Sequence, residues 1–92
     1  MPVKIKLFAN LAESVGAKEI EVDALDVREA FETLEERYEK LHGEIFKDEE
    51  QQKIRDNITV IKDGRNITYL DGLDTELKDG DELSVFPLVG GG

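Results

Sequence analysis

One amphipathic segment constrains the fold more than any other feature of the sequence. Apolar residues recur there at helical spacing and form a single stripe, which consists of Val27, Ala30, Phe31, Leu34, Tyr38 and Leu41. Asp26 can cap the first turn together with Glu29 three residues later, and Gly43 is a natural stop. The spacing predicts one helix over residues 27–42. Because that helix has only one apolar face, another layer of secondary structure must cover it.

Two stretches before the helix alternate apolar and polar residues, which is typical of strands with one buried face. Val3, Ile5 and Leu7 share one face within residues 3–8. Residues 18–23 alternate in the same way. We expect a loop around residues 14–16, so the two strands are predicted to form a hairpin with a long turn.

The part of the chain after the helix predicts three more strands. Residues 44–57 are largely polar, and we expect them to form a solvated, irregular excursion. Residues 58–62 are rich in β-branched side chains and predict a strand. Asp63–Gly64 is a two-residue hairpin signal, so the returning strand is expected at residues 67–70. Residues 83–88 predict the last strand.

This order of elements predicts an α+β fold with a mixed sheet of about five strands and one main helix packed on one face. The economical packing places the first and last strands side by side and parallel in the centre, which is the β-grasp, or ubiquitin-like, arrangement. We expect residues 1–88 to form this domain. Residues 89–92 would then be a flexible glycine tail, because glycine loses the most backbone freedom on ordering.

Composition excludes several classes of function. A net charge of −10 argues against binding to nucleic-acid phosphates or to an anionic membrane, although it could also serve only solubility. The absence of cysteine excludes a thiolate metal site and a cysteine nucleophile, and His42 is the only histidine. We therefore expect no metal and no catalytic constellation. The N-terminal residues hold no apolar run of signal-peptide length, so a cytoplasmic location is expected.

Two phenylalanines fall on the face of the sheet that should point away from the helix. The alternation places Phe8 and Phe86 there, close together if their strands are neighbours. Ile61 is expected to share that face, and Pro87 and Leu88 follow directly in the chain. A cluster of exposed apolar side chains indicates a docking site for a partner. The alternative is that a loop covers this face, or that the strand ends turn the rings inward.

The end of the chain carries a connected motif. Lys78–Glu82 reads KDGDE, Phe86–Pro87 closes the last strand, and the chain continues to Gly91–Gly92. Together with Phe8 and Gly16 near the start, this motif resembles the MoaD/ThiS family of ubiquitin-like sulfur carrier proteins. The resemblance covers the whole chain. Within the family it is greatest to the small subunit of molybdopterin synthase and to archaeal small modifier proteins.

The resemblance implies a carrier that is not itself an enzyme and holds no permanent cofactor. An E1-like adenylating enzyme, similar to MoeB and ThiF, would use ATP to activate the Gly92 carboxylate, which is then converted to a thiocarboxylate. Val89, Gly90 and Gly91 would thread into the partner, because glycines without a Cβ pass through a narrow channel and the four residues span roughly 13 Å when extended. The sulfur would be donated in molybdopterin synthesis, together with a MoaE-like large subunit.

Other readings of the same motif remain open. The activated Gly92 could form an isopeptide bond with lysines of target proteins, as a ubiquitin-like modifier does. The sulfur could instead serve thiamine synthesis or tRNA thiolation. A plain interaction module is a third class, since a terminal glycine run can also be an idle tail or a linker remnant.

Overall fold

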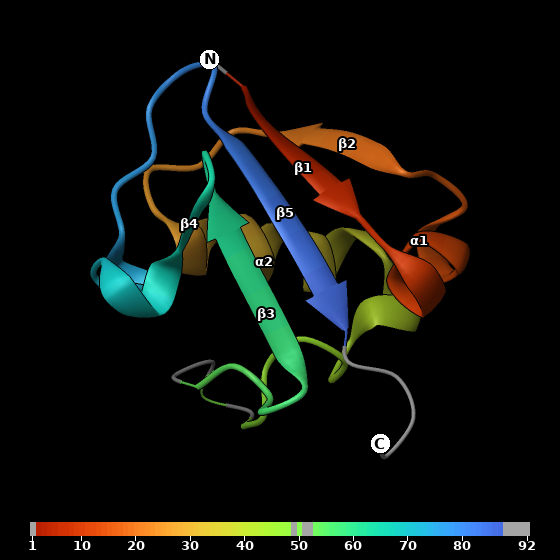
Figure 1. Cartoon of the computed structure of the whole chain (residues 1–92). Helices are drawn as coiled ribbons and strands as arrows, with labels where there is room; N and C mark the ends of the chain where they lie inside the picture. Colours follow the sequence, from red (N-terminus) through yellow and green to blue (C-terminus); the bar gives the residue numbers. More distant parts are fainter. Residues whose placement is uncertain (1, 49, 51–52, 88–92) are drawn as a thin grey trace.

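The computed structural model describes residues 2–48, 50 and 53–87. Its five-stranded sheet has the order β2-β1-β5-β3-β4, with β1 parallel to β5 and the other neighbours antiparallel (Figure 1). The strands are β1 (Val3–Leu7), β2 (Glu19–Val22), β3 (Ile58–Lys62), β4 (Arg65–Asn66) and β5 (Glu82–Pro87). The first and last strands therefore lie side by side in the centre, and the predicted β-grasp fold is confirmed.

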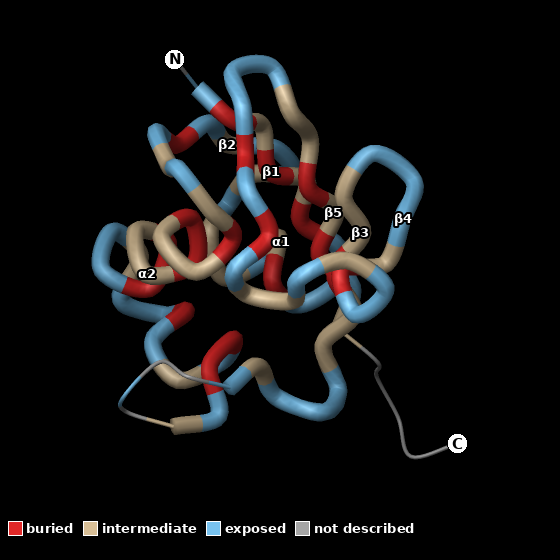
Figure 2. Tube along the Cα trace, turned by 90° about the vertical axis from the view of Figure 1, so that its left-hand side faces the viewer, coloured by how far each residue is buried: buried red, intermediate tan, exposed pale blue. Residues whose placement is uncertain are grey.

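Helix α2 (Val27–Arg37) crosses one face of the sheet, and the core lies between them (Figure 2). Along β1 and β5 the residues with buried side chains alternate with more exposed ones, as a strand with one covered face requires. Phe31 of α2 packs edge-on against Phe46, with ring centroids 6.3 Å apart. The buried core comprises Val3, Ile5, Leu7, Leu11, Val22, Val27, Ala30, Phe31, Leu34, Leu41, Ile45, Phe46, Val60, Ile67, Leu77, Leu83 and Val85.

Helix α2 begins where the sequence predicts but ends earlier. The Asp26 side chain accepts a hydrogen bond of 2.8 Å from the backbone N–H of Glu29, so the predicted cap is confirmed. The prediction of one helix to residue 42 is wrong, because Tyr38 is extended and a separate 3₁₀ turn, η1 (Glu39–Leu41), follows. That turn leaves Leu41 with no exposed surface, so tertiary packing overrides continuous helical spacing.

The predicted loop around residues 14–16 is also wrong, because helix α1 (Ala9–Val15) fills most of the connection between β1 and β2. Gly16 ends this helix in the left-handed conformation, with φ of 80°, and its N–H donates to the carbonyl of Ala12. Leu11 of α1 is buried in the core. Seven residues are too few to show a helical period, and Phe8 provides no capping side chain, so the sequence carried little signal for this helix.

The hairpin after β3 turns as predicted at Asp63–Gly64, where both φ angles are positive, at 47° and 90°. The returning strand, however, is only the two residues of β4, and the strand predicted at residues 67–70 is wrong. A 3₁₀ turn, η2 (Ile67–Tyr69), replaces it because the side-chain Oδ1 of Asn66 accepts hydrogen bonds from both the N–H and the hydroxyl of Thr68. A second such turn, η3 (Gly72–Asp74), follows.

The segment after α2 is anchored more firmly than the sequence suggested. Ile45 and Phe46 are 0% and 2% exposed, so the prediction of a solvated excursion is wrong for them. Their two N–H groups donate to the same carboxylate oxygen of Glu35, at 3.1 and 2.9 Å. Glu35 is itself buried on α2, and it satisfies two backbone donors that would otherwise be buried without a partner. Phe46 forms an isolated β-bridge with Ile54, which closes the segment.

Candidate docking site

The outer face of the sheet carries a pair of stacked aromatic rings. The rings of Phe8 and Phe86 have centroids 4.3 Å apart and planes inclined by 16°. The two residues are 39% and 36% exposed, although such large apolar side chains are usually buried. The predicted proximity of these two side chains is confirmed. We call these two residues the Phe8–Phe86 patch.

Strand register explains why the two rings meet. Leu7 pairs with Val85 in the parallel ladder of β1 and β5, so the next residues along the two strands lie beside each other. Leu7 and Val85 point into the core, and alternation turns their successors to the outer face. Ala9 then takes a positive φ of 53°, uncommon for a residue other than glycine, and the chain leaves the strand for α1. The stack contributes about 0.5–1.5 kcal/mol beyond the area that it buries.

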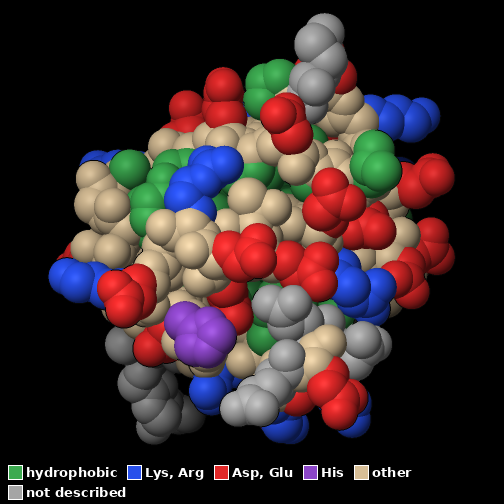
Figure 3. Space-filling model, turned by 180° about the vertical axis from the view of Figure 1, so that it is seen from behind, with side chains coloured by type: hydrophobic (Ala, Val, Ile, Leu, Met, Phe, Trp, Pro, Cys, Tyr) green, Lys and Arg blue, Asp and Glu red, His purple; other side chains and the backbone are tan. Residues whose placement is uncertain are grey.

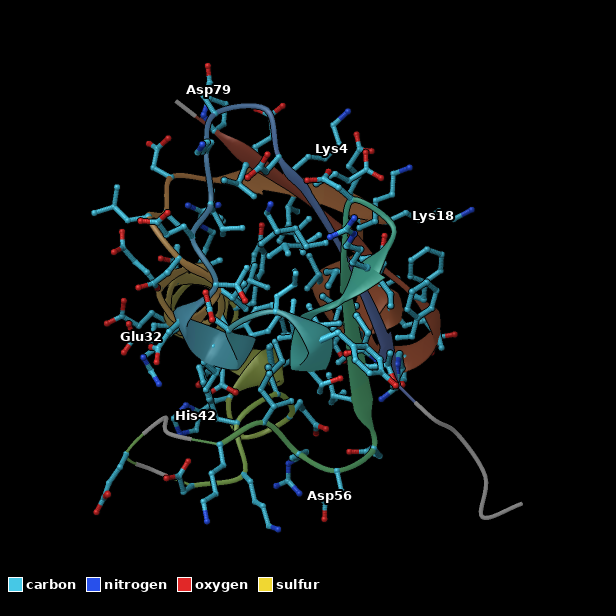
Figure 4. The ribbon with its side chains drawn as sticks, turned by 60° about the vertical axis from the view of Figure 1, so that its left-hand side comes forward. Lys4, Lys18, Glu32, His42, Asp56 and Asp79 are labelled. Carbon is cyan, nitrogen blue, oxygen red and sulfur yellow. The ribbon has the colours of Figure 1, made fainter. Side chains whose placement is uncertain are left out.

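Charged side chains occupy the same face along β1, before Phe8. Lys6 forms an ion pair of 3.1 Å with Glu82, and Lys4 approaches Glu19 to 3.9 Å. Figure 4 shows Lys4 on the side of the molecule away from Glu32, which lies on α2. The outer face thus changes from paired charges at the start of β1 to exposed aromatic rings at its end. Such a boundary gives a partner an apolar contact with a polar margin.

The remaining predicted docking residues lie in different places. Ile61 is on the outer face and half-buried, but it pairs with Ser84, which lies two residues before Phe86 on β5. Pro87 is half-buried and pairs with Ile58, which packs against the core, so it has the core-facing parity of Val85 rather than that of Phe86. The docking role of all these residues stays a prediction.

The predicted reactive end lies outside the described residues. This holds for Leu88, for the threading residues Val89, Gly90 and Gly91, and for Gly92. The last described residue, Pro87, directly follows Phe86, and β5 ends at the same end of the sheet as the parallel strand β1 (Figure 1). Any segment that continues from β5 therefore starts two positions after Phe86 in the sequence.

The helix side of the molecule has a different character. Asp and Glu side chains spread over much of this surface, with His42 among them (Figure 3). Within the described part of the chain, no three histidine or carboxylate side chains gather closely enough to hold a metal ion. No helix among these residues is long and apolar enough to cross a bilayer.

Comparison with known proteins matches the chain to one protein family. The ThiS family matches residues 5–92. The chain is 38% identical to small archaeal modifier protein 3 of Haloferax volcanii, and the alignment covers all of both proteins. It is 33% identical to a protein of Archaeoglobus fulgidus that is named as a candidate sulfur carrier protein, again over the full length of both.

Solved structures of similar proteins share the fold. The solution structure of small archaeal modifier protein 1 from Methanosarcina acetivorans matches with a TM-score of 0.88 and 38% identity, covering 99% of this chain and 96% of that one. A protein of Pyrococcus furiosus, named as a candidate molybdopterin converting factor subunit 1, matches with a TM-score of 0.74 and 33% identity, covering 97% and 99%. The β-grasp topology described above is therefore that of these relatives.

Proposed function

Because the chain belongs to the ThiS family of ubiquitin-like proteins, we propose that it is a sulfur carrier whose reactive group is the Gly92 carboxylate. The single observation that carries this proposal is the position of β5. It lies in the centre of the sheet, runs parallel to β1 and ends beside an exposed aromatic patch. A partner enzyme that docks on the patch would meet the chain as it leaves β5, and this supports delivery of the glycine segment to that enzyme.

The chemistry that we propose has two steps. The Gly92 carboxylate attacks the α-phosphorus of ATP on an E1-like enzyme, and pyrophosphate leaves. Hydrosulfide then attacks the acyl carbon and displaces AMP, so that a thiocarboxylate remains on Gly92. With no cysteine in the chain, a side-chain persulfide is not available, and the terminal carbonyl is the place for the sulfur.

The sulfur acceptor that we propose is the molybdopterin precursor, held by a larger catalytic subunit. Support comes from the 33% identity to the Pyrococcus furiosus protein named as a candidate molybdopterin converting factor subunit. On this proposal the same Phe8–Phe86 patch contacts the activating enzyme and the larger subunit in turn. Catalysis would reside in these partners.

A second candidate function has its own support. The 38% identity to small archaeal modifier protein 3 over both full lengths favours a protein modifier, in which Gly92 is joined to lysine amines of target proteins. Both functions begin with adenylation of Gly92 and differ in the nucleophile that follows. Hydrosulfide gives the carrier, whereas a lysine amine gives the conjugate.

Adenylation tests what the two functions share. The chain is incubated with its cognate E1-like enzyme and ATP, and pyrophosphate exchange is measured. We expect exchange with the full chain and none with a variant that lacks Gly91 and Gly92. Exchange that persists in the deletion variant would contradict the assignment of Gly92. Conjugates detected in cells and lost with the same deletion would favour the modifier function.

A further inference from the structure

A groove lies between helix α1 and the start of β2, on the outer face of the sheet. Its volume is about 530 Å³, and it borders the Phe8–Phe86 patch because Phe8 is one of its lining residues. The lining residues from α1 and from the start of β2 are Ala9, Ala12, Glu13, Lys18 and Glu19. We call this hollow the α1–β2 groove.

The backbone holds the two walls of the groove in place. Ala9, Ala12 and Glu13 are three and four positions apart, so they share one face of α1. The opposite wall is tied to β1, since the N–H of Leu7 donates to the carbonyl of Lys18 at 2.8 Å. Figure 1 shows α1 at the end of β1, next to the start of β2. Both alanines end in a methyl group, so the α1 wall leaves room for a side chain from another molecule.

A specific protein complex needs far more surface than the two rings of the patch. Each partner in such a complex contributes about 800 Å² and roughly 20–30 residues. A protein that docks on the Phe8–Phe86 patch must therefore also cover the surface around it. Because Phe8 belongs to both the patch and the α1–β2 groove, a docking surface that extends toward α1 includes the groove.

Charge gives the groove a direction. Two lysines and two glutamates line it, so its charges balance on a chain whose net charge is −10. Lys6 and Glu19 already have partners on the outer face. Lys18 and Glu13 lie on opposite walls, are exposed, and form no ion pair with any described residue. Figure 4 shows Lys18 projecting outward from the molecule. A partner segment thus meets a positive charge on one wall and a negative charge on the other.

We propose that the α1–β2 groove receives a large apolar side chain of the E1-like enzyme. On the enzyme this side chain is flanked by an acidic residue, which faces Lys18, and by a basic residue, which faces Glu13. The two charges fix the direction in which the enzyme segment crosses the groove, while the patch beside it supplies apolar contact. Since the occupant is the enzyme that would activate Gly92, the assignment rests on the proposed function.

A variant that fills the groove tests the apolar contact. Full-length chain is titrated with its cognate E1-like enzyme in a calorimeter without ATP, so that docking is measured apart from adenylation. Ala12→Leu should lower the affinity about tenfold or more, because the added side chain occupies the space that the enzyme needs. The matched control is Asn10→Leu, which places leucine on α1 outside the groove and should leave the affinity unchanged. Urea unfolding shows whether each variant is folded.

A charge exchange tests the direction without depending on Ala12. Lys18→Glu combined with Glu13→Lys keeps the net charge at −10 but reverses the two walls. We expect about tenfold weaker binding at low ionic strength, and a smaller difference in high salt, because exposed charges are screened. The matched control is Lys78→Glu combined with Glu76→Lys, at exposed positions before β5, which should bind like the wild-type chain.

Phe86→Asp separates failure of this proposal from failure of the proposed docking site. The groove is not the contact if Ala12→Leu and the charge-exchanged chain bind at full strength while Phe86→Asp binds weakly. If Phe86→Asp also binds at full strength, the patch and the groove both lie outside the interface. Sedimentation that shows a dimer of the chain, broken by Ala12→Leu, would overturn the proposal too, because a second copy would then occupy the groove.

Discussion

Replacing Glu35 with alanine should destabilise the fold more than any other exchange of a charged side chain on α2. The carboxylate is 5% exposed and accepts hydrogen bonds from Ile45 and Phe46. Without it, two buried N–H groups lose their acceptor, and each costs about 1–3 kcal/mol. We expect Glu35→Ala to lower the free energy of unfolding by about 2–5 kcal/mol. Alanine's higher helix propensity offsets only a few tenths of that.

Urea unfolding followed by circular dichroism measures the change, with the midpoint expected to fall at an unchanged slope. Glu35→Gln keeps an acceptor oxygen but loses the charge-assisted part of the bonds, so a smaller loss of about 1–2 kcal/mol is expected. The matched control is Glu36→Ala, which removes the exposed neighbouring carboxylate and should change stability by less than about 0.5 kcal/mol.

Hydrogen exchange gives an independent readout of the same contacts. The amides of Ile45 and Phe46 should be protected in the wild-type chain and should lose protection in Glu35→Ala. The reasoning is refuted if Glu35→Ala unfolds at the same urea concentration as Glu36→Ala. Rapid exchange of both amides in the wild-type chain would refute it equally.

Three further changes test other parts of the molecule. Phe86→Asp should weaken binding to the E1-like enzyme by about 2 kcal/mol or more, measured by calorimetry, while the circular dichroism spectrum stays native. The same exchange at the exposed Tyr69 should leave binding unchanged. Equal binding by both variants would show that the Phe8–Phe86 patch is not part of the interface. Asp26→Ala removes the cap of α2 and should cost about 1 kcal/mol in urea unfolding, and no loss would show that the cap is dispensable. Gly16→Ala should lower the free energy of unfolding by about 1 kcal/mol, because alanine is strained at a φ of 80°. No atom lies within 4 Å of an added Cβ, so no steric clash contributes. A stabilised variant would contradict the left-handed conformation of Gly16.

Local sequence signals were sufficient to predict the elements that show a complete apolar repeat or a defined turn. The capped start of α2, the alternating strands and the Asp63–Gly64 turn each follow from residues close together in the sequence. The stacking of Phe8 on Phe86 required one more step, namely that the first and last strands are neighbours. Once that topology is assumed, side-chain parity places both rings on the outer face.

The features that were missed depend on contacts between distant residues. Helix α1 is too short for a visible period, and its main sequence signal is Gly16 at the end. The early end of α2 places Leu41 in the core, which helical spacing alone does not require. Glu35 looks like one more surface carboxylate in a chain with 22 acidic residues, because its partners lie ten and eleven positions away.

The position of the candidate docking site was easier to predict from the sequence than the residues that form it. Phe8 and Phe86 form its centre, whereas Pro87 has the parity of the core and Ile61 pairs two residues away from Phe86 along the ladder. Alternation in the sequence does not predict how close two side chains on one face lie, since strands twist and end at different residues. The short length of β4 was missed because the sequence suggested a longer returning strand. The contacts of the Asn66 side chain with Thr68 explain why that strand ends after two residues.

The central claim is that Gly92 carries sulfur, and intact-mass spectrometry tests it most directly. The chain is incubated with its cognate E1-like enzyme, ATP and sulfide, and its intact mass is then measured. We expect the mass to rise by the difference between one sulfur and one oxygen atom, with fragmentation placing the change on Gly92. An unchanged mass in a reaction that consumes ATP, or sulfur found on any other residue, would contradict the claim.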